Sequence, residues 1–160
     1  DKKVFLILKH IFLYFCSEKV RKMFNKETEY ALRSLVYIQV ENYKGRRPGI
    51  SEIAAEIDAP RFFTAKILQR MARQGFVQSR KGRGGGFFFD SKQAPLKIED
   101  VIKAVEGDNI MTGCAFGLEY CDELNPCPLH SRYAPIREKI NTLVGEETIQ
   151  SLAKRPEGTD

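Results

Sequence analysis

The chain has 160 residues, enough for one domain of ordinary size with an appended helix or arm. Its 42% hydrophobic and 29% charged residues exclude a disordered chain and are typical of a globular protein. The net charge of +5 is unevenly spread. Residues 60–90 hold seven Lys and Arg residues and one acid, whereas acids outnumber Lys and Arg twelve to six from Glu99 onward. The middle of the chain could hold a polyanion, although a solvated basic face is the plainer alternative.

The apolar segment 4–16 is too short to span a membrane, and it contains Lys9 and His10. It has no small-residue cleavage site, so we do not expect a signal peptide. Residues 1–22 are either an extension upstream of Met23 or an extra amphipathic helix. The four cysteines lack the even spacing of a disulfide framework. We therefore expect reduced thiols, a cytoplasmic location and no membrane partner.

Two helices are predicted in the first third of the chain. Apolar residues at helical spacing indicate the first over residues 28–42, with Thr28 as its cap. Glycines and a proline break the pattern at residues 43–49. A second, short helix follows over residues 52–57, with Ser51 as its cap.

A third helix is predicted over residues 61–74, after a tight turn in which Pro60 suits the first helical position. Gly75 is expected to end this helix as a cap. Its inward-facing residues are expected to be Phe63, Ile67, Leu68 and Met71. Two helices joined by a tight turn are typical of a helix-turn-helix, whose second helix lies in the DNA major groove.

A hairpin follows the third helix. Residues 76–80 and 87–89 are predicted strands, and the glycine-rich residues 81–86 are the turn between them. A helix-turn-helix followed by a hairpin is a winged helix-turn-helix. The sequence therefore predicts a mainly α fold with a small β-hairpin.

The C-terminal part is predicted to be helical on both sides of a long loop. Apolar residues mark a helix over residues 96–105 that stops at Gly107, and a final long helix follows the loop. A short turn over residues 149–152 comes last. The predicted regions are an N-terminal extension (1–22), a DNA-binding domain (23–95), and a cysteine-loop sensor with dimerisation helices (96–160).

Basic residues gather on the two elements that would touch DNA. At the start of the third helix, the residues expected to reach base edges are Arg61, Thr64, Ala65 and Lys66. Further along this helix, the residues expected to meet phosphates are Arg70 and Arg73. The hairpin tip adds Arg80, Lys81 and Arg83. The alternative is a helix-turn-helix used for protein contacts, with a hairpin that is merely a turn.

The loop at residues 108–128 carries three of the four cysteines, and Cys16 lies outside this group. The spacing is Cys-x6-Cys-x5-Cys-x2-His, formed by Cys114, Cys121, Cys127 and His130. Thiolates and imidazole suit an iron–sulfur cluster, zinc or Cu(I). Because no tight Cys-x2-Cys knuckle is present, the spacing favours a cluster over zinc. Ordinary loop thiols, a redox disulfide and a surface or helix-capping role for His130 are the alternatives.

Over residues 23–152 the chain resembles the IscR/NsrR family of bacterial iron–sulfur transcriptional regulators. The residues that carry the resemblance are Glu29–Arg33, Ile53-Ala54, Lys66–Gln69, the wing at 82–87, and Val101–Gly107 followed by the cysteine loop. The resemblance implies a homodimer that crosses its long C-terminal helices and binds palindromic promoter DNA. It also implies that the protein senses iron–sulfur status, nitric oxide or oxidants.

The resemblance implies cluster ligands too. The three cysteine ligands of a 2Fe-2S or 4Fe-4S cluster would be Cys114, Cys121 and Cys127. The fourth would be His130, or Glu29 from the first helix of a partner subunit. The first cysteine gap is one residue longer than the family pattern. Ala65 stands where one branch has a base-reading glutamate.

The predicted function is a redox-sensing transcriptional regulator, in particular a repressor, and not an enzyme, because no nucleophile–base constellation is evident. Three alternatives remain open. They are a zinc-stapled winged-helix protein, a thiol–disulfide switch on the same fold, and a cluster carrier without operator specificity.

Overall fold

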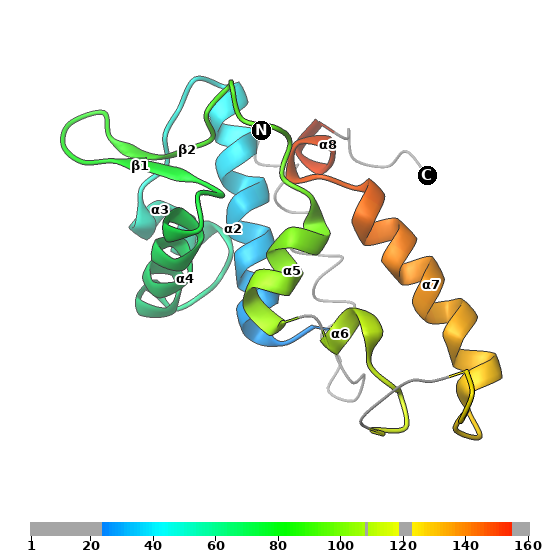
Figure 1. The fold of residues 1–160 in the computed structure, drawn as a ribbon. Helices are drawn as coiled ribbons and strands as arrows, with labels where there is room; N and C mark the ends of the chain where they lie inside the picture. The colour runs from blue at the N-terminus through cyan, green and yellow to red at the C-terminus, as the bar shows by residue number, and fades with distance from the viewer. Residues whose placement is uncertain (1–23, 108, 119–122, 155–160) are drawn as a thin grey trace.

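The computed structural model describes residues 24–107, 109–118 and 123–154 (Figure 1). The described residues form helices and one two-stranded antiparallel sheet, which confirms the predicted fold class. The interpretation of residues 1–22 lies outside the described residues. The helices are α2 (Lys26–Tyr43), α3 (Ile50–Glu56), α4 (Arg61–Arg73), α5 (Ile98–Glu106), α6 (Asn109–Thr112), α7 (His130–Glu146) and α8 (Ile149–Lys154), and the strands are β1 (Gln78–Arg80) and β2 (Gly86–Phe88).

Helix α2 is the central element. Helices α3 and α4 and the β1–β2 hairpin lie on one side of it, and α5 and α8 lie on the other (Figure 1). The hairpin projects from the body, and α7 runs along the opposite edge of the molecule. No helix in the described part of the chain has the length and apolarity needed to cross a bilayer.

The caps of the first two helices differ from the prediction. Helix α2 starts two residues early because the Asn25 side chain accepts a hydrogen bond from the Thr28 amide at 2.8 Å. Thr28 is instead buried in the first turn. Helix α3 starts at Ile50 behind Gly49, which has no side chain to cap with. Ser51 lies inside that helix.

Helix α4 ends at Arg73, one residue earlier than predicted, and it faces the core differently. Gly75 has a left-handed φ of 78°, and its amide donates to the Ala72 carbonyl at 3.0 Å. Pro60 is the residue before the helix rather than its first residue. The prediction that Phe63 faces inward is wrong, since its side chain is 56% exposed. The buried residues of α4 are Thr64, Ile67, Leu68 and Met71.

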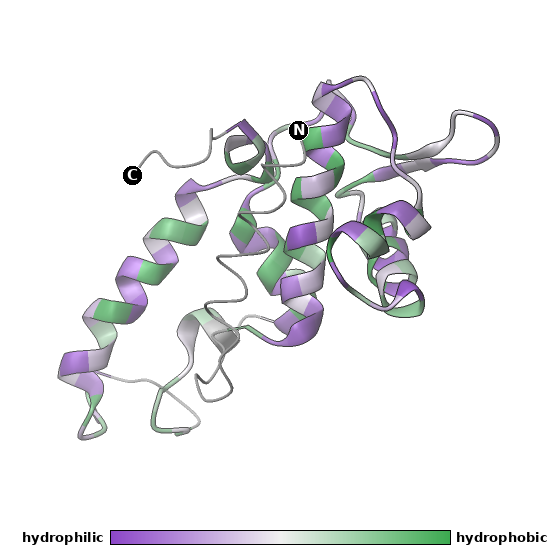
Figure 2. Ribbon diagram, turned by 180° about the vertical axis from the view of Figure 1, so that it is seen from behind, coloured by the Kyte–Doolittle hydropathy of each residue, from purple (hydrophilic) through white to green (hydrophobic). Residues whose placement is uncertain are grey.

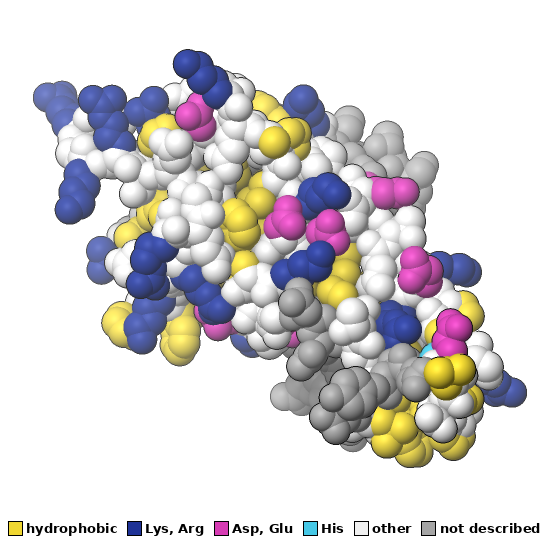
Figure 3. All heavy atoms as spheres, in the orientation of Figure 1, with side chains coloured by type: hydrophobic (Ala, Val, Ile, Leu, Met, Phe, Trp, Pro, Cys, Tyr) yellow, Lys and Arg dark blue, Asp and Glu magenta, His cyan; other side chains and the backbone are white. Residues whose placement is uncertain are grey.

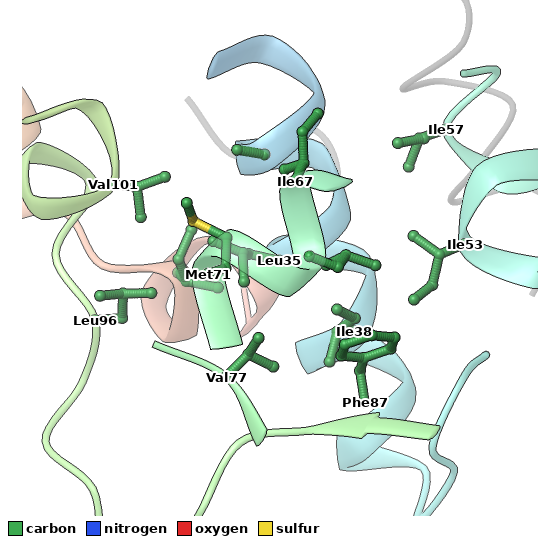
Figure 4. Close-up of a cluster of buried hydrophobic side chains, with 13 residues drawn as sticks. Leu35, Ile38, Ile53, Ile57, Ile67, Met71, Val77, Phe87, Leu96 and Val101 are labelled. Carbon is green, nitrogen blue, oxygen red and sulfur yellow. The ribbon is translucent and has the colours of Figure 1, made fainter. Parts of the chain in front are cut away.

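One hydrophobic core joins the helix-turn-helix to the C-terminal helices (Figure 4). Leu35 and Ile38 of α2 lie at its centre and are fully buried. The C-terminal part contributes Leu96, Val101 and Ile149 to the same cluster. A movement of α5 would therefore change the packing of the helices of the DNA-binding unit.

The hairpin is hydrogen-bonded to α2 through the Asn42 side chain. Its amide nitrogen donates to the Phe87 carbonyl at 3.3 Å, and its oxygen accepts from the Phe89 amide at 2.9 Å. Gly86 has a φ of 139°, and a Cβ there would lie 2.2 Å from the Arg47 carbonyl oxygen. Only glycine fits this position, which sets where the hairpin leaves the body.

The long C-terminal helix begins earlier than its apolar stripe indicated, and a short helix, α6, precedes the cysteines. Helix α7 starts at His130 and contains Pro135. Figure 2 shows hydrophobic residues recurring along it. Two of them, Ile136 and Leu143, are 55% and 60% exposed. The described residues thus leave one apolar face of this helix uncovered.

Candidate DNA-binding surface and cysteine loop

Helix α4 presents a basic surface to solvent. The side chains of Arg61, Lys66 and Arg73 are exposed. The guanidinium Nε of Arg61 donates to the Ser51 hydroxyl at 2.9 Å, which ties the start of α4 to α3. The Lys66 ammonium lies 4.6 Å from the centre of the Phe62 ring. These cations lie on the helix that a helix-turn-helix places in the major groove.

Thr64 does not lie on this surface. It is fully buried, and its hydroxyl donates to the Pro60 carbonyl at 3.1 Å. A buried hydroxyl with its partner at the start of the same helix is not available to a base edge. The expectation that Thr64 reads bases therefore finds no support in this conformation.

Arg70 is partly exposed and is also engaged within the molecule. Its guanidinium donates to the Ala104 carbonyl at 2.7 Å and pairs with the Glu27 carboxylate at 2.9 Å. It therefore ties α4 to the last turn of α5 and to the first turn of α2. Cations are favoured at the C-terminal end of a helix, where carbonyl groups lack partners. A phosphate contact by Arg70 would compete with these bonds.

The hairpin tip carries the remaining predicted cations. Arg80, Lys81 and Arg83 are exposed, and none of them pairs with a carboxylate among the described residues. Figure 3 shows Lys and Arg side chains clustered on the projecting hairpin and again over α4. The helix and the hairpin thus form two basic elements on one side of the molecule, as a winged helix needs to contact a duplex.

Two of the three loop cysteines lie together. The sulfur atoms of Cys114 and Cys127 are 3.6 Å apart, and both side chains are partly exposed. Cys121 lies outside the described residues. Two thiolates that bind one tetrahedral ion at about 2.3 Å lie about 3.8 Å apart, so this pair has a spacing that fits a shared metal centre. Within the described ranges, no three candidate ligand side chains gather at one point.

The loop is held by α7 at both cysteines. The Arg137 guanidinium donates to the Thr112 and Gly113 carbonyls, each at 3.2 Å, just before Cys114. The His130 amide donates to the Cys127 carbonyl at 2.9 Å, so one turn joins the last cysteine to the first residue of α7. This hydrogen-bonded turn holds the backbone of His130 close to the backbone of Cys127 in space.

Glu29 lies in the first turn of α2 and is only partly exposed. Its carboxylate accepts a hydrogen bond from the Lys26 ammonium at 3.0 Å. The resemblance implies that Glu29 of one subunit would be a ligand of the cluster held by the other subunit. That role therefore needs a dimer.

Two exposed residues of α4, Phe62 and Gln69, were not among the predicted DNA contacts. Phe62 is 66% exposed and adjoins Lys66. The signal that could have found them is helical spacing, because both lie opposite the stripe formed by Thr64, Ile67, Leu68 and Met71.

The fold and the two basic elements define a winged-helix DNA-binding protein. Residues 24–155 match the Rrf2 family, described as iron-dependent transcriptional regulators. The chain belongs to this family and is a transcriptional regulator rather than an enzyme.

Two relatives illustrate the match. Protein aau3 of Rhizobium meliloti is 32% identical over 137 residues, covering 82% of this chain and 86% of that protein. The HTH-type transcriptional regulator IscR of Xenorhabdus nematophila is 24% identical over 131 residues, covering 82% and 79%. The resemblance to the IscR/NsrR family of regulators is therefore confirmed.

Solved structures share the fold at low identity. CymR of B. subtilis, the global cysteine regulator, matches with a TM-score of 0.65 and 16% identity, covering 88% of this chain and 100% of that one. IscR of T. potens matches with a TM-score of 0.59 and 16% identity, covering 88% and 93%. An oxidized form of Staphylococcus aureus CymR matches with a TM-score of 0.63 and 15% identity, covering 84% and 98%.

Proposed function

We propose that this protein is a cytoplasmic, homodimeric repressor that binds palindromic promoter DNA through α4 and the hairpin. An iron–sulfur cluster, of 2Fe-2S or 4Fe-4S type, held in the cysteine loop sets its affinity for that DNA. The cysteine ligands are Cys114, Cys121 and Cys127. The fourth ligand is His130 or Glu29 of the partner subunit. The bound cluster supplies reactivity toward oxidants and nitric oxide.

The observation that carries this proposal is the Cys114–Cys127 pair. These residues are 13 positions apart in the chain, yet their sulfur atoms lie 3.6 Å from each other. Helix α7 holds the backbone beside both cysteines. Thiolates are soft ligands that suit iron–sulfur clusters and zinc. The family description as iron-dependent regulators favours iron.

Support for coupling between the loop and DNA comes from the end of α5, which directly precedes the loop. Arg70 joins this end to α4. The Glu106 carboxylate accepts hydrogen bonds from the Thr28 hydroxyl at 2.6 Å and from the backbone N–H of Asn25 at 2.9 Å. A change in the loop that moves the end of α5 would therefore act on both α2 and α4. A shift of a few kcal/mol between two arrangements is enough to change DNA affinity.

Support for a homodimer comes from α7. Its exposed apolar residues Ile136 and Leu143 lie seven positions apart and so on one face of the helix. Burial of this face against a second copy would place two α4 helices in one assembly. A palindromic site needs two reading helices about one turn of DNA apart.

A thiol–disulfide switch is the second candidate, and the same cysteine pair supports it. Peroxide would oxidise the two thiols to one disulfide, with two electrons passing to the peroxide and two molecules of water released. The sulfur atoms would need to approach from 3.6 Å to about 2.05 Å. The structural likeness to CymR, which has been solved in an oxidized form, makes this switch worth testing.

The test is anaerobic purification followed by absorbance, iron, sulfide and zinc analysis. We expect a coloured protein with iron and sulfide, and loss of both in Cys114→Ser and Cys127→Ser variants. Cys16→Ser is the matched control and should keep the cluster. A colourless protein with stoichiometric zinc would contradict the proposal, and a metal-free protein that forms a Cys114–Cys127 disulfide would favour the second candidate.

A further inference from the structure

The outward face of α4 is a single stripe. Its exposed residues are Phe62, Lys66, Gln69 and Arg73. Their intervals of four, three and four residues keep them on one side of the helix. The buried residues Thr64, Ile67, Leu68 and Met71 lie on the opposite side. This stripe is therefore the part of α4 that projects furthest from the core.

Phe62 is the unusual member of this stripe. Its side chain is 66% exposed, at the N-terminal end of the helix. The Lys66 ammonium lies over its ring at 4.6 Å from the centre, which is within the range of a cation–π interaction. The ring is thus held beside a cation rather than packed into the core.

The surroundings of Phe62 favour a polyanion as the occupant of this face. Residues 60–89 contain no acid, and exposed cations are present both on α4 and on the hairpin. Figure 3 shows exposed hydrophobic side chains among Lys and Arg side chains in the region of α4. The core of a protein–protein interface is depleted of charged residues, whereas this face carries Lys66 and Arg73.

We propose that Phe62 contacts the 5-methyl group of a thymine in the major groove, and that Lys66 and Gln69 contact the neighbouring bases. The thymine methyl is the apolar feature that the major groove presents. Lys66 can donate to the O6 and N7 acceptors of guanine, and Gln69 can pair with adenine. This inference rests on the proposed DNA-binding function and adds a residue that selects thymine at one position of each half-site.

Phe63 provides a matched control. Its ring is 56% exposed and lies edge-on to Phe62, with the ring centres 6.3 Å apart. One residue along a helix turns the side chain by about 100°, so Phe63 lies on the flank of the stripe. A contact that depends on the outward face should need Phe62 and not Phe63.

The experiment selects tight-binding duplexes from a random pool with the full chain, under anaerobic reducing conditions. Each thymine of the selected site is then replaced by deoxyuridine, which removes only the methyl group. We expect one position in each half-site at which this change weakens binding about fourfold, as for one buried methyl group. The Phe62→Ala variant should bind more weakly and show no further loss at that position, whereas Phe63→Ala should keep the full loss.

Equal methyl dependence in the wild-type and Phe62→Ala proteins would overturn the inference, as would its absence from both. If Phe62→Ala leaves DNA binding unchanged but dissociates the dimer in sedimentation, the ring belongs to a protein interface and the inference is wrong. Phe62→Leu, which keeps an apolar side chain, guards against loss of folding and should retain part of the methyl dependence. Failure to select any preferred duplex would instead overturn the proposed DNA-binding function.

Discussion

Arg70 joins three helices through one guanidinium group. Its bonds run to the backbone of Ala104 at 2.7 Å and to the carboxylate of Glu27 at 2.9 Å. The carbonyl bond is partly buried and charge-assisted, so it should contribute more than the solvent-exposed ion pair. The side chain therefore holds α4 in position rather than serving only as a surface charge.

We predict that Arg70→Ala lowers the free energy of unfolding by about 1–2 kcal/mol, because the carbonyl groups at the end of α5 lose a charged donor. Arg73→Ala is the control. It removes the same charge from the exposed stripe of α4 and should change the stability by less than about 0.5 kcal/mol. Urea unfolding followed by circular dichroism measures both. Equal stability losses in the two variants would contradict this account of Arg70.

The hairpin and the described helices other than α6 could be predicted in type and order from the sequence, because their apolar periods and glycines are strong signals. Helix α6 lies inside the segment predicted to be a loop. The residues on the buried face of α4 could not all be predicted from the sequence. Phe63 is apolar and Thr64 is polar, yet Thr64 is buried and its hydroxyl is satisfied by the Pro60 carbonyl. The predicted caps Thr28 and Ser51 were wrong because both residues lie inside their helices. Helix α2 is capped by Asn25, which precedes its apolar stripe, and α3 begins at Ile50 behind a glycine.

The hairpin should contribute a salt-dependent share of DNA binding. Arg83→Ala is expected to weaken binding to all duplexes alike and to reduce the slope of log K against log salt by about 0.9 if this side chain neutralises one phosphate. Lys139→Ala removes one positive charge from α7 and should leave the slope unchanged. Titrations at several salt concentrations measure both slopes. An unchanged slope in Arg83→Ala would show that this residue does not meet phosphate.

The exposed face of α7 should hold the dimer together. Ile136→Asp and Leu143→Asp place a charge in a buried apolar interface and are expected to dissociate the dimer. Glu138→Ala changes an exposed residue on a different face of α7 and should leave the assembly intact. Sedimentation velocity distinguishes the two states. A monomeric wild-type protein, or a dimer unaffected by both aspartates, would contradict the proposed interface.

Across the whole chain, the family could be recognised from the sequence, but the arrangement of the cysteine loop could not. Spacing predicts which cysteines are candidate ligands, whereas the approach of Cys114 to Cys127 depends on contacts made by α7. The link from α5 to α4 through Arg70 joins residues 34 positions apart in the chain. Such contacts between residues far apart in the chain leave no local signal in the sequence.

Promoter affinity with and without the metal centre, at the same ionic strength and protein concentration, decides whether the cysteine loop controls DNA binding. We predict that removal of the centre, by chelation or in Cys114→Ser, changes the affinity for the selected duplex by about 5-fold to 150-fold, as expected for an allosteric coupling of this kind. The Arg70→Ala variant should show a smaller change, because the end of α5 is no longer joined to α4. Equal affinities of the loaded and the metal-free protein would contradict the claim.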